Sequence, residues 1–505
     1  MAEPMVVAAG IHKRFGGITA LRGVTLEIQP GEVHCLAGEN GCGKSTLIKI
    51  IGGVERPDEG AVSVLGRAYS ALDPRLALDL GIQTIHQDFS LLPNLTVAEN
   101  IALSALVAAR RRRVRKAEIA HMASAAIERL GVALDLEADV ADLSVADRQL
   151  TAIGRALAQD ARVIFMDEPT TALTWREVDA LFRTVRTLKE RGVATVFVSH
   201  KLDEALGISD RVTVLRSGEV TATGDAKNFD RATLTYAMTG RELVLDRPPS
   251  YASPEASEAG GATRLAPALQ VENLGRRGMF AGVSFTVHPG EIVGITGLLG
   301  SGRTEIAEAI FGLMPADEGT IRVGGELRRI QSVQDAIASG IGYVPEDRLT
   351  QGLFLDQSIE TNIIAADVDR HAGPLGLLRR GALAEAARDA ISALRIKAPV
   401  PGAPVRSLSG GNAQRVVLAK WLERRPNVLI LNGPTVGVDV GSKFDILAIL
   451  RNHGREGMGI VIISDDVPEL ISICHRALIV RRGRIDSELA GDDLTEAALL
   501  ARMAA

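Results

Sequence analysis

The chain is poor in cysteine and in aromatic residues, and it has no long apolar run. Its three cysteines, Cys35, Cys42 and Cys474, supply neither a disulfide framework nor a CxxC pair for zinc, which is typical of a reducing compartment. No stretch of about 18 apolar residues occurs, and the N-terminal residues lack a basic segment followed by an apolar one. We therefore expect an intracellular protein without a membrane-spanning segment of its own.

An excess of positive charge is also absent, since 57 Lys and Arg residues face 62 Asp and Glu residues and the formal net charge is −5. Without a global basic field, nucleic acid is not an expected partner. The remaining composition is that of an ordinary globular protein, with 46% hydrophobic and 24% charged residues. A length of 505 residues is too great for one compact core, so two or more domains are expected.

The sequence contains one unit twice. The segment PGEV at 30–33 returns as PGEI at 289–292, displaced by 259 residues, whereas Leu143 returns as Leu408, displaced by 265. The second copy therefore holds six additional residues, which we place in a surface segment that tolerates insertion.

We expect domains at 1–245 and 268–505, joined by a linker at 246–267 that is rich in Pro, Ser, Ala and Gly. Because the linker has no apolar period, it is expected to be extended and flexible. In each copy, short apolar runs, such as 163–166 and 428–431, alternate with helical stretches. This pattern indicates the α/β class with a mostly parallel, buried sheet.

Residues 38–46, GENGCGKST, have the spacing of a phosphate-binding loop and stand between an expected strand and an expected helix. The glycines let backbone N–H groups surround phosphate oxygens, and the helix presents its positive end. Lys44 is expected to reach the β- and γ-phosphates of ATP, and Ser45 to ligate Mg²⁺. The expected nucleotide-binding residues here are Gly38, Glu39, Asn40, Gly41, Cys42, Gly43, Lys44, Ser45 and Thr46.

The apolar run at 163–166 ends in Asp167 and Glu168, at the strand edge where α/β proteins form ligand sites. Asp167 suits Mg²⁺ through water, and Glu168 suits polarising the attacking water. An acidic pair after a strand is by itself often a solvated turn, but its position after a phosphate loop favours the catalytic interpretation. His200 ends another apolar run and is placed to bond the γ-phosphate, while Gln87 is expected to reach the metal and the water.

Two residues keep two interpretations open. Phe15, in KRFGG, either stacks on adenine or packs in the core. The Cys42 thiol, inside the phosphate loop, is either open to alkylation in the absence of ATP or buried and inert.

Taken in order, these motifs resemble those of the ATP-binding cassette (ABC) ATPases, with Walker A at 38–45, Walker B ending at Asp167 and Glu168, a Q-loop at Gln87 and an H-loop at His200. Residues 408–412, LSGGN, are similar to the ABC signature LSGGQ. The resemblance covers essentially the whole chain. It implies two fused cassettes, each with a mostly parallel sheet core and a helical subdomain.

Three further segments, GLLGSGRTE at 297–305, GYVPEDR at 342–348 and GVDVGSK at 437–443, resemble the fused ATPase subunits of bacterial monosaccharide importers of the ribose, xylose and galactose type. That resemblance implies a peripheral protein on the cytoplasmic face of the membrane. It would hydrolyse ATP with Mg²⁺ to drive separate permease subunits, which are fed by a solute-binding protein. The basic run at 110–116 is then either a solvated face or a contact with the permease or with anionic lipid.

The second copy departs from the motif chemistry at its catalytic positions. The replacements are Arg303 for the loop lysine, Asn432 and Gly433 for the Walker B carboxylates, Asp465 for the histidine and Glu346 for the glutamine. Without a glutamate the site lacks its water-polarising group, and an acid beside a γ-phosphate is repulsive. We therefore expect a degenerate second site.

The signatures show the complementary asymmetry. In this family the signature is a helix N-terminus that closes on the γ-phosphate held by the opposite domain. Domain 1 has LSVAD at 143–147, where side chains replace the glycines, whereas domain 2 offers Ser409, Gly410, Gly411 and Asn412. A head-to-tail sandwich of the two domains would give one competent and one degenerate composite site.

Two other functions known for tandem cassettes fit this chain less well. A ribosome-acting translation factor typically carries a long charged interdomain linker and two intact glutamates, whereas here the linker is short with few charged residues and Gly433 replaces one glutamate. A DNA-repair ATPase of the excision type needs zinc-binding cysteines, which the chain lacks.

Overall fold

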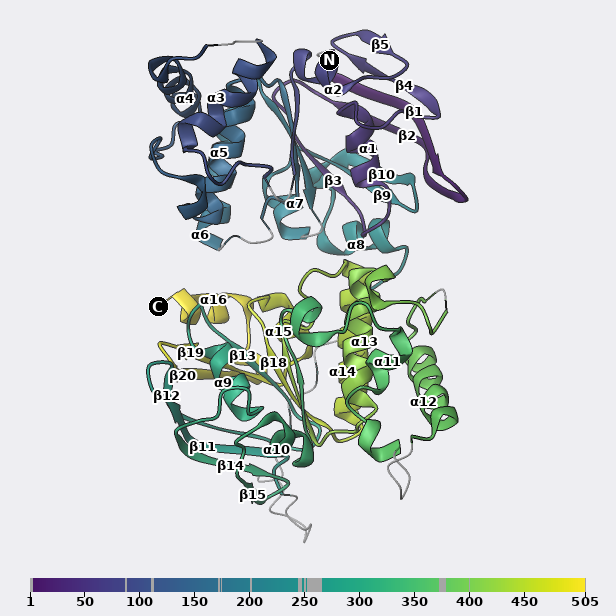
Figure 1. Cartoon of the computed structure of the whole chain (residues 1–505), viewed down its shortest axis with the longest axis vertical. Coiled ribbons are helices and arrows are strands. Elements are labelled where there is room, and N and C mark those ends of the chain that lie inside the picture. Colours follow the sequence, from purple (N-terminus) through teal and green to yellow (C-terminus); the bar gives the residue numbers. More distant parts are fainter. Residues whose placement is uncertain are drawn as a thin grey trace. The chain divides into compact units, whose positions relative to one another are not determined.

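The computed structural model describes residues 3–86, 89–109, 113–170, 173, 175–199, 202–243, 248, 251, 266–371, 378–398 and 400–504. The chain divides into two compact units, Met1–Leu243 and Val244–Ala505 (Figure 1). Among the described residues, no helix combines the length and the apolar character needed to span a bilayer.

The central sheet of the first unit is formed by short apolar strands that are buried along nearly their whole length. Burial on both faces is typical of parallel strands, which need helices on either side. The order is β10-β9-β3-β8-β7-β6, and only β10 runs antiparallel to its neighbour. The strands are β3 (Val33–Ala37), β6 (Ile82–Ile85), β7 (Val163–Asp167), β8 (Ala194–Ser199), β9 (Arg211–Arg216) and β10 (Glu219–Asp225).

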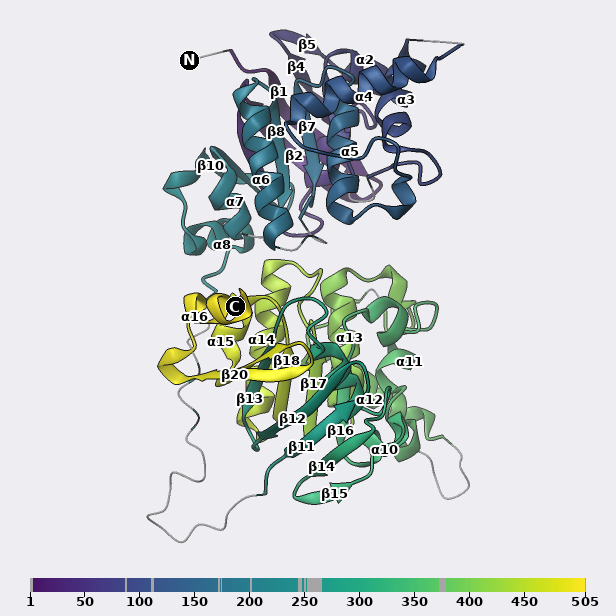
Figure 2. The ribbon, with the colours of Figure 1, turned by 90° about the vertical axis from the view of Figure 1, so that its left-hand side faces the viewer.

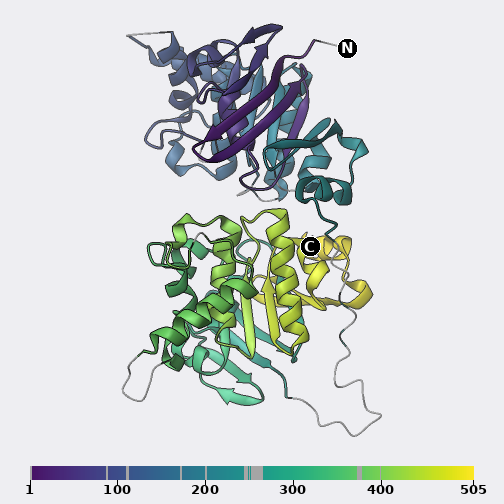
Figure 3. The same cartoon turned by 90° about the vertical axis from the view of Figure 1, so that its right-hand side faces the viewer.

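An antiparallel sheet of order β2-β1-β4-β5 accompanies the central one, and Figure 3 turns its purple strands toward the viewer. Its strands are β1 (Val6–Phe15), β2 (Ile18–Ile28), β4 (Glu59–Val64) and β5 (Arg67–Tyr69). The helices of this unit are α1 (Lys44–Ile51), α2 (Pro74–Asp79), α3 (Val97–Ala108), α4 (Lys116–Leu130), α5 (Val145–Leu157), α6 (Trp175–Glu190), α7 (Leu202–Ile208) and α8 (Arg231–Thr239). Helices α3, α4 and α5 pack together through Ile101, Ile127 and Ile153 as a helical part, while α6 runs beside β8 (Figure 2).

The second unit repeats this arrangement. Its central sheet is β16 (Ile341–Val344), β17 (Val428–Asn432), β18 (Gly459–Ile463), β13 (Ile292–Thr296), β19 (Arg476–Arg481) and β20 (Arg484–Ala490), and its antiparallel sheet is β12 (Phe280–Val287), β11 (Leu269–Arg276), β14 (Glu318–Val323) and β15 (Glu326–Arg328). Its helices are α9 (Arg303–Ile310), α10 (Val333–Ala338), α11 (Ile359–Ile364), α12 (Arg380–Ala393), α13 (Gly410–Leu422), α14 (Val440–Arg455), α15 (Val467–Ile473) and α16 (Glu496–Ala504). The predicted α/β class is confirmed, and the central sheet of each unit is mostly parallel, as expected.

The additional residues of the second copy enter at two places rather than one. Asn100 Oδ1 accepts a hydrogen bond from the Leu92 N–H, and Asn362 Oδ1 accepts the equivalent bond from the Phe354 N–H, so this pair of anchors is displaced by 262 residues. Half of the insertion therefore precedes Phe354, where a single π-helical turn lies at Arg348–Gly352. The other half enters between α11 and the 3-10 turn at Val405–Ser407.

Tyr251, inside the predicted linker, packs on the second unit. Its hydroxyl donates to the Pro289 carbonyl at 2.9 Å, and its ring stacks on His288 and meets the edge of His475. At this residue the segment is held in place rather than freely extended.

All three cysteines are buried. Burial raises the pKa of Cys35 to about 12, and it also raises the pKa values of Cys42 and Cys474.

Candidate nucleotide sites

The phosphate loop of the first unit joins β3 to α1, as its sequence context predicts. Gly38 and Gly43 have φ of 150° and 110°. A Cβ on Gly38 would lie 2.4 Å from the Leu215 carbonyl oxygen, and one on Gly43 would lie 2.7 Å from that of Ala20. Both positions therefore exclude every other residue, sterically as well as by backbone conformation.

Lys44 is buried and lies inside this loop. Its Nζ donates to the carbonyls of Gly38 at 2.7 Å and Glu39 at 2.9 Å. The ammonium is thus held by the backbone that surrounds the expected phosphate position, while Ser45 is exposed at the first turn of α1. Of the two interpretations of Cys42, the buried one holds, since its side chain is 5% exposed.

The acidic pair lies at the same edge of the sheet as the loop. In the parallel register Ala37 pairs with Ser199, and Asp167 pairs with Val198, so the strands leading to the loop and to the carboxylates end together. Burial and the neighbouring Glu168 raise the pKa of Asp167, and Lys44 offsets part of this shift. Lys44 and Asp167 therefore belong to one electrostatic site.

Glu168 adopts a left-handed backbone conformation, with φ of 48°, and its N–H donates to the Val198 carbonyl. A non-glycine residue in this region costs about 1–3 kcal/mol and persists only where the surrounding structure holds it in place. Its counterpart Gly433 has φ of 58° and donates to the Ile463 carbonyl, so the backbone is the same in both copies. The first copy keeps a glutamate where glycine would be free of strain.

The described residues of the first site fit a magnesium ion by the chemistry of their donors. Ser45 offers a hydroxyl and Asp167 a carboxylate, both hard oxygen donors of the kind that Mg²⁺ prefers. Their counterparts Thr304 and Asn432 are hydrogen-bonded to each other at 3.2 Å, which shows that the fold brings these two positions together. Gln87 and His200, which the sequence also placed here, lie outside the described residues.

Phe15 ends β1 with a side chain that is 46% exposed, and the Lys13 ammonium lies 5.2 Å from the ring centroid. This exposure argues against the core interpretation. Of the two alternatives, stacking on a base stays a prediction.

The second phosphate loop has the same shape as the first, but its arginine contacts groups of its own unit. Arg303 Nη1 donates to the Gly297 carbonyl at 2.8 Å, and Nη2 lies 3.7 Å from an oxygen of Asp465. The guanidinium is thus paired within its own unit by the residue that replaces the histidine.

A cavity of about 400 Å³ lies beside this second loop. Its lining residues are Thr304, Glu308, Tyr343, Glu346, Asp347, Gln351 and Asn432. Three carboxylates around one cavity disfavour a bare triphosphate, because like charges repel more strongly at a partly buried site. Burial raises the pKa of Glu308, and the neighbouring Glu305 adds to this shift.

Restoring the missing carboxylate by Gly433→Glu is expected to change the ATPase rate less than about twofold, because the other groups of that site are also replaced. A Cβ at Gly433 would also lie 2.8 Å from Val436 Cγ2, so the new side chain has to displace a neighbour. Steady-state phosphate release by the purified chain measures the rate. A doubling would show that the second pocket lacks only its glutamate.

The two signature serines differ in what they bind. Ser144, the N-cap of α5, donates to the Asp147 carboxylate at 2.8 Å and accepts from the Asp147 N–H, so its hydroxyl is fully engaged. Ser409, the N-cap of α13, accepts from the Asn412 side-chain amide at 2.9 Å. Within the part of the chain that the structure describes, the Ser409 hydroxyl hydrogen has no acceptor, whereas that of Ser144 is given to Asp147.

The signature glycines also serve packing. A Cβ on Gly411 would lie 2.3 Å from Ser442 Oγ, and one on Gly410 would lie 3.0 Å from the Gly437 carbonyl oxygen. The N-terminus of α13 therefore lies directly against the start of α14.

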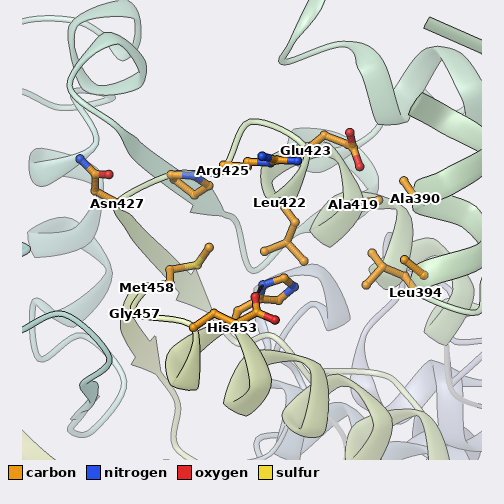
Figure 4. A pocket seen from close by; sticks show the side chains of 13 residues that line it. Ala390, Leu394, Ala419, Leu422, Glu423, Arg425, Asn427, His453, Gly457 and Met458 are labelled. Carbon is orange, nitrogen blue, oxygen red and sulfur yellow. Dashed lines mark ion pairs between the residues drawn. The ribbon is translucent and has the colours of Figure 1, made fainter. Parts of the chain in front are cut away.

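A larger cavity of about 600 Å³ lies at the other end of α13, between α12, α14 and the start of β17 (Figure 4). Its lining includes Glu423, Arg425, His453 and Met458, and no residue of the phosphate loop or signature. It is therefore not the nucleotide site.

In the sequence, GYVPEDR indicates a family resemblance but does not reveal the hydrogen bonds that its arginine makes. Arg348 donates to the carbonyls of Val436 and Gly437, in the loop that follows Gly433. It thereby ties the segment after β16 to the segment after β17. No local signal in the sequence marks this contact, because the partners of Arg348 lie 88 residues away or more.

Comparison with known proteins gives consistent matches. A family model described as "ABC transporter" matches residues 21–171 and 280–436. Ribose import ATP-binding protein RbsA 1 of Rubrobacter xylanophilus is 44% identical over 98% of this chain and 97% of its own length, and RbsA 2 of Rhizobium etli is 41% identical over 99% and 97%. Among solved structures, an ATP-binding cassette, MJ1267, in its ADP conformation is 27% identical, with a TM-score of 0.42 over 46% of this chain and 94% of that one.

Proposed function

Since the chain belongs to the ABC transporter family and is an ATPase of that family with two fused cassettes, we propose that it energises the import of a monosaccharide through separate permease subunits. Ribose is the first solute to test, because the relatives named above are ribose import proteins. The chain would act as a peripheral protein on the cytoplasmic face of the membrane, with a solute-binding protein delivering the sugar.

One observation carries the finer proposal of a single hydrolytic site. The groups needed to hold and cleave ATP, Lys44, Asp167 and Glu168, lie on the first unit, whereas the available signature hydroxyl, Ser409, lies on the second. Random decay would scatter losses over both sets. In the ATP-bound enzyme, the competent site would form where the ATP-binding groups of the first unit meet the signature of the second. The degenerate site would form where the replaced groups of the second unit meet the signature of the first.

In this site each residue has a distinct task. Lys44 neutralises the β- and γ-phosphates, and the N–H groups of the loop bind their oxygens. Glu168 accepts a proton from, and orients, the attacking water. Ser45 and Asp167, with Gln87, would hold Mg²⁺, which supplies neutralising charge to the phosphates. His200 would hydrogen-bond the γ-phosphate, and Ser409 with the Gly411 N–H would close on it from the other side.

Closure on ATP and reopening after hydrolysis would pass motion to the permease through the segments around Gln87 and Glu346. The experiment is reconstitution of the chain with its permease in liposomes. ATPase activity is measured with binding proteins loaded with ribose, xylose, galactose or no sugar. Stimulation by one loaded binding protein is the expected result. Equal rates in every condition, together with co-sedimentation with ribosomes instead of membranes, would favour the alternative of a ribosome-acting ATPase.

A further inference from the structure

A buried arginine joins the signature helix of the second unit, α13, to two neighbouring segments. Arg415 Nη2 donates to Asp445 Oδ2 on α14 at 2.6 Å, and its Nη1 donates to the carbonyls of Leu394 at 3.3 Å and Arg395 at 2.9 Å, which follow α12. Its side chain is 8% exposed. One guanidinium thus joins α13 to the neighbouring helix of the core and to the end of the helical part.

A second contact lies one turn nearer the signature. The Asn412 Oδ1 accepts a hydrogen bond from the Lys397 N–H at 2.8 Å, while its amide nitrogen donates to Ser409. The same residue therefore links the signature serine to the segment that Arg415 holds.

The first unit lacks this arrangement. At the displacement of 265 residues, Leu150 takes the place of Arg415 and Ala180 that of Asp445. A cavity of about 340 Å³ occupies the corresponding place, lined among others by Leu130, Leu150 and Ala180. The arginine clamp is present beside the available signature serine and absent beside the engaged one.

We infer that the Arg415–Asp445 clamp is a positioning device for hydrolysis, which holds the N-terminus of α13 so that Ser409 meets the γ-phosphate in register. This inference rests on the proposed function, in which Ser409 completes the competent site. Because a planar guanidinium bonded on two edges fixes both the rotation and the translation of a helix, its loss displaces the helix start. Arg415 touches no nucleotide itself and acts through Ser409.

The test is a double-mutant cycle between Arg415→Leu, which copies the first unit, and Ser409→Ala, with kcat and KM for ATP measured on the purified chain and Tm recorded for each variant. Arg415→Leu is expected to lower kcat on the order of tenfold to a hundredfold, the usual consequence of misplacing a positioned group. KM should change little, because Lys44 binds ATP on the other unit. In the Ser409→Ala background, Arg415→Leu should cost little more, because both changes remove one function.

Asp445→Asn serves as a milder variant that keeps the side-chain volume, in case Arg415→Leu does not fold. Leu150→Met, at the counterpart position of the first unit, is the matched control and should leave kcat unchanged. A lower Tm with unchanged kcat for Arg415→Leu and Asp445→Asn would overturn the inference, as would losses that multiply in the double variant. If Ser409→Ala itself has no effect, the proposed composite site fails instead.

Discussion

Replacing Glu168 with Gln is expected to lower kcat at least about a hundredfold, since a positioned general base contributes about that factor or more. Gln has the same shape and occupies the same left-handed backbone conformation, so the loop and Lys44 remain in place. ATP binding should therefore be retained. Phosphate release measures turnover, and equilibrium binding of a fluorescent ATP analogue measures occupancy on the same preparation.

The second unit offers a matched control, because Gly433 has the same φ sign and the same backbone hydrogen bond as Glu168. Gly433→Gln introduces the same side chain at the equivalent place and should leave most of the turnover. Residual activity of Glu168→Gln above about a few per cent would mean that another group polarises the water. Loss of ATP binding would mean that the carboxylate serves the fold instead.

Replacing Gly411 with Ala is expected to lower kcat on the order of a hundredfold, because the new Cβ meets Ser442 Oγ and displaces the start of α13. Ala146, its counterpart in the first unit, already carries that Cβ, and Ala146→Gly should not raise the rate. Steady-state ATPase assays with Tm measurements compare these variants.

A compensating variant separates packing from phosphate approach. Gly411→Ala combined with Ser442→Gly removes the clash with Ser442 and should restore Tm. In the proposed composite site kcat should recover less than Tm, because a methyl group still stands beside the Gly411 N–H that would bind the γ-phosphate. Full recovery of kcat would show that glycine at this position serves only the contact between α13 and α14.

The duplication could be predicted because PGE recurs at a displacement of 259 residues and LS at 265. The buried strands could be predicted because their residues are apolar. The phosphate loop and Asp167 could be placed because parallel strands end at one sheet edge. The location of the insertion could not be predicted from the sequence, because no residue between Glu346 and Leu408 was recognised as the counterpart of one in the first copy. The hydrogen bonds of Asn362 supply the missing anchor only once the fold is known.

Backbone strain and long-range pairs lay beyond the sequence. The residues MDEP do not indicate that Glu168 has a positive φ. In the fold this conformation accompanies a hydrogen bond from the Glu168 N–H to the Val198 carbonyl of β8, which is distant in sequence. The change from Leu150 to Arg415 is visible in the alignment of the copies, but Asp445 lies 30 residues further on and pairs with it only through the packing of α13 on α14. Hydrophobic periodicity carries no information about such a pair.

Because all three native cysteines are buried, they should react slowly with the reagents used for site-directed labelling. The thiolate is the form that attacks thiol reagents, and each of these buried residues has a thiol with a raised pKa. A single cysteine introduced at an exposed position, such as Leu299 in the second phosphate loop, would therefore carry a spectroscopic probe without removal of any native cysteine. Such probes would follow opening and closing of the cassettes through the ATPase cycle in the otherwise unaltered protein.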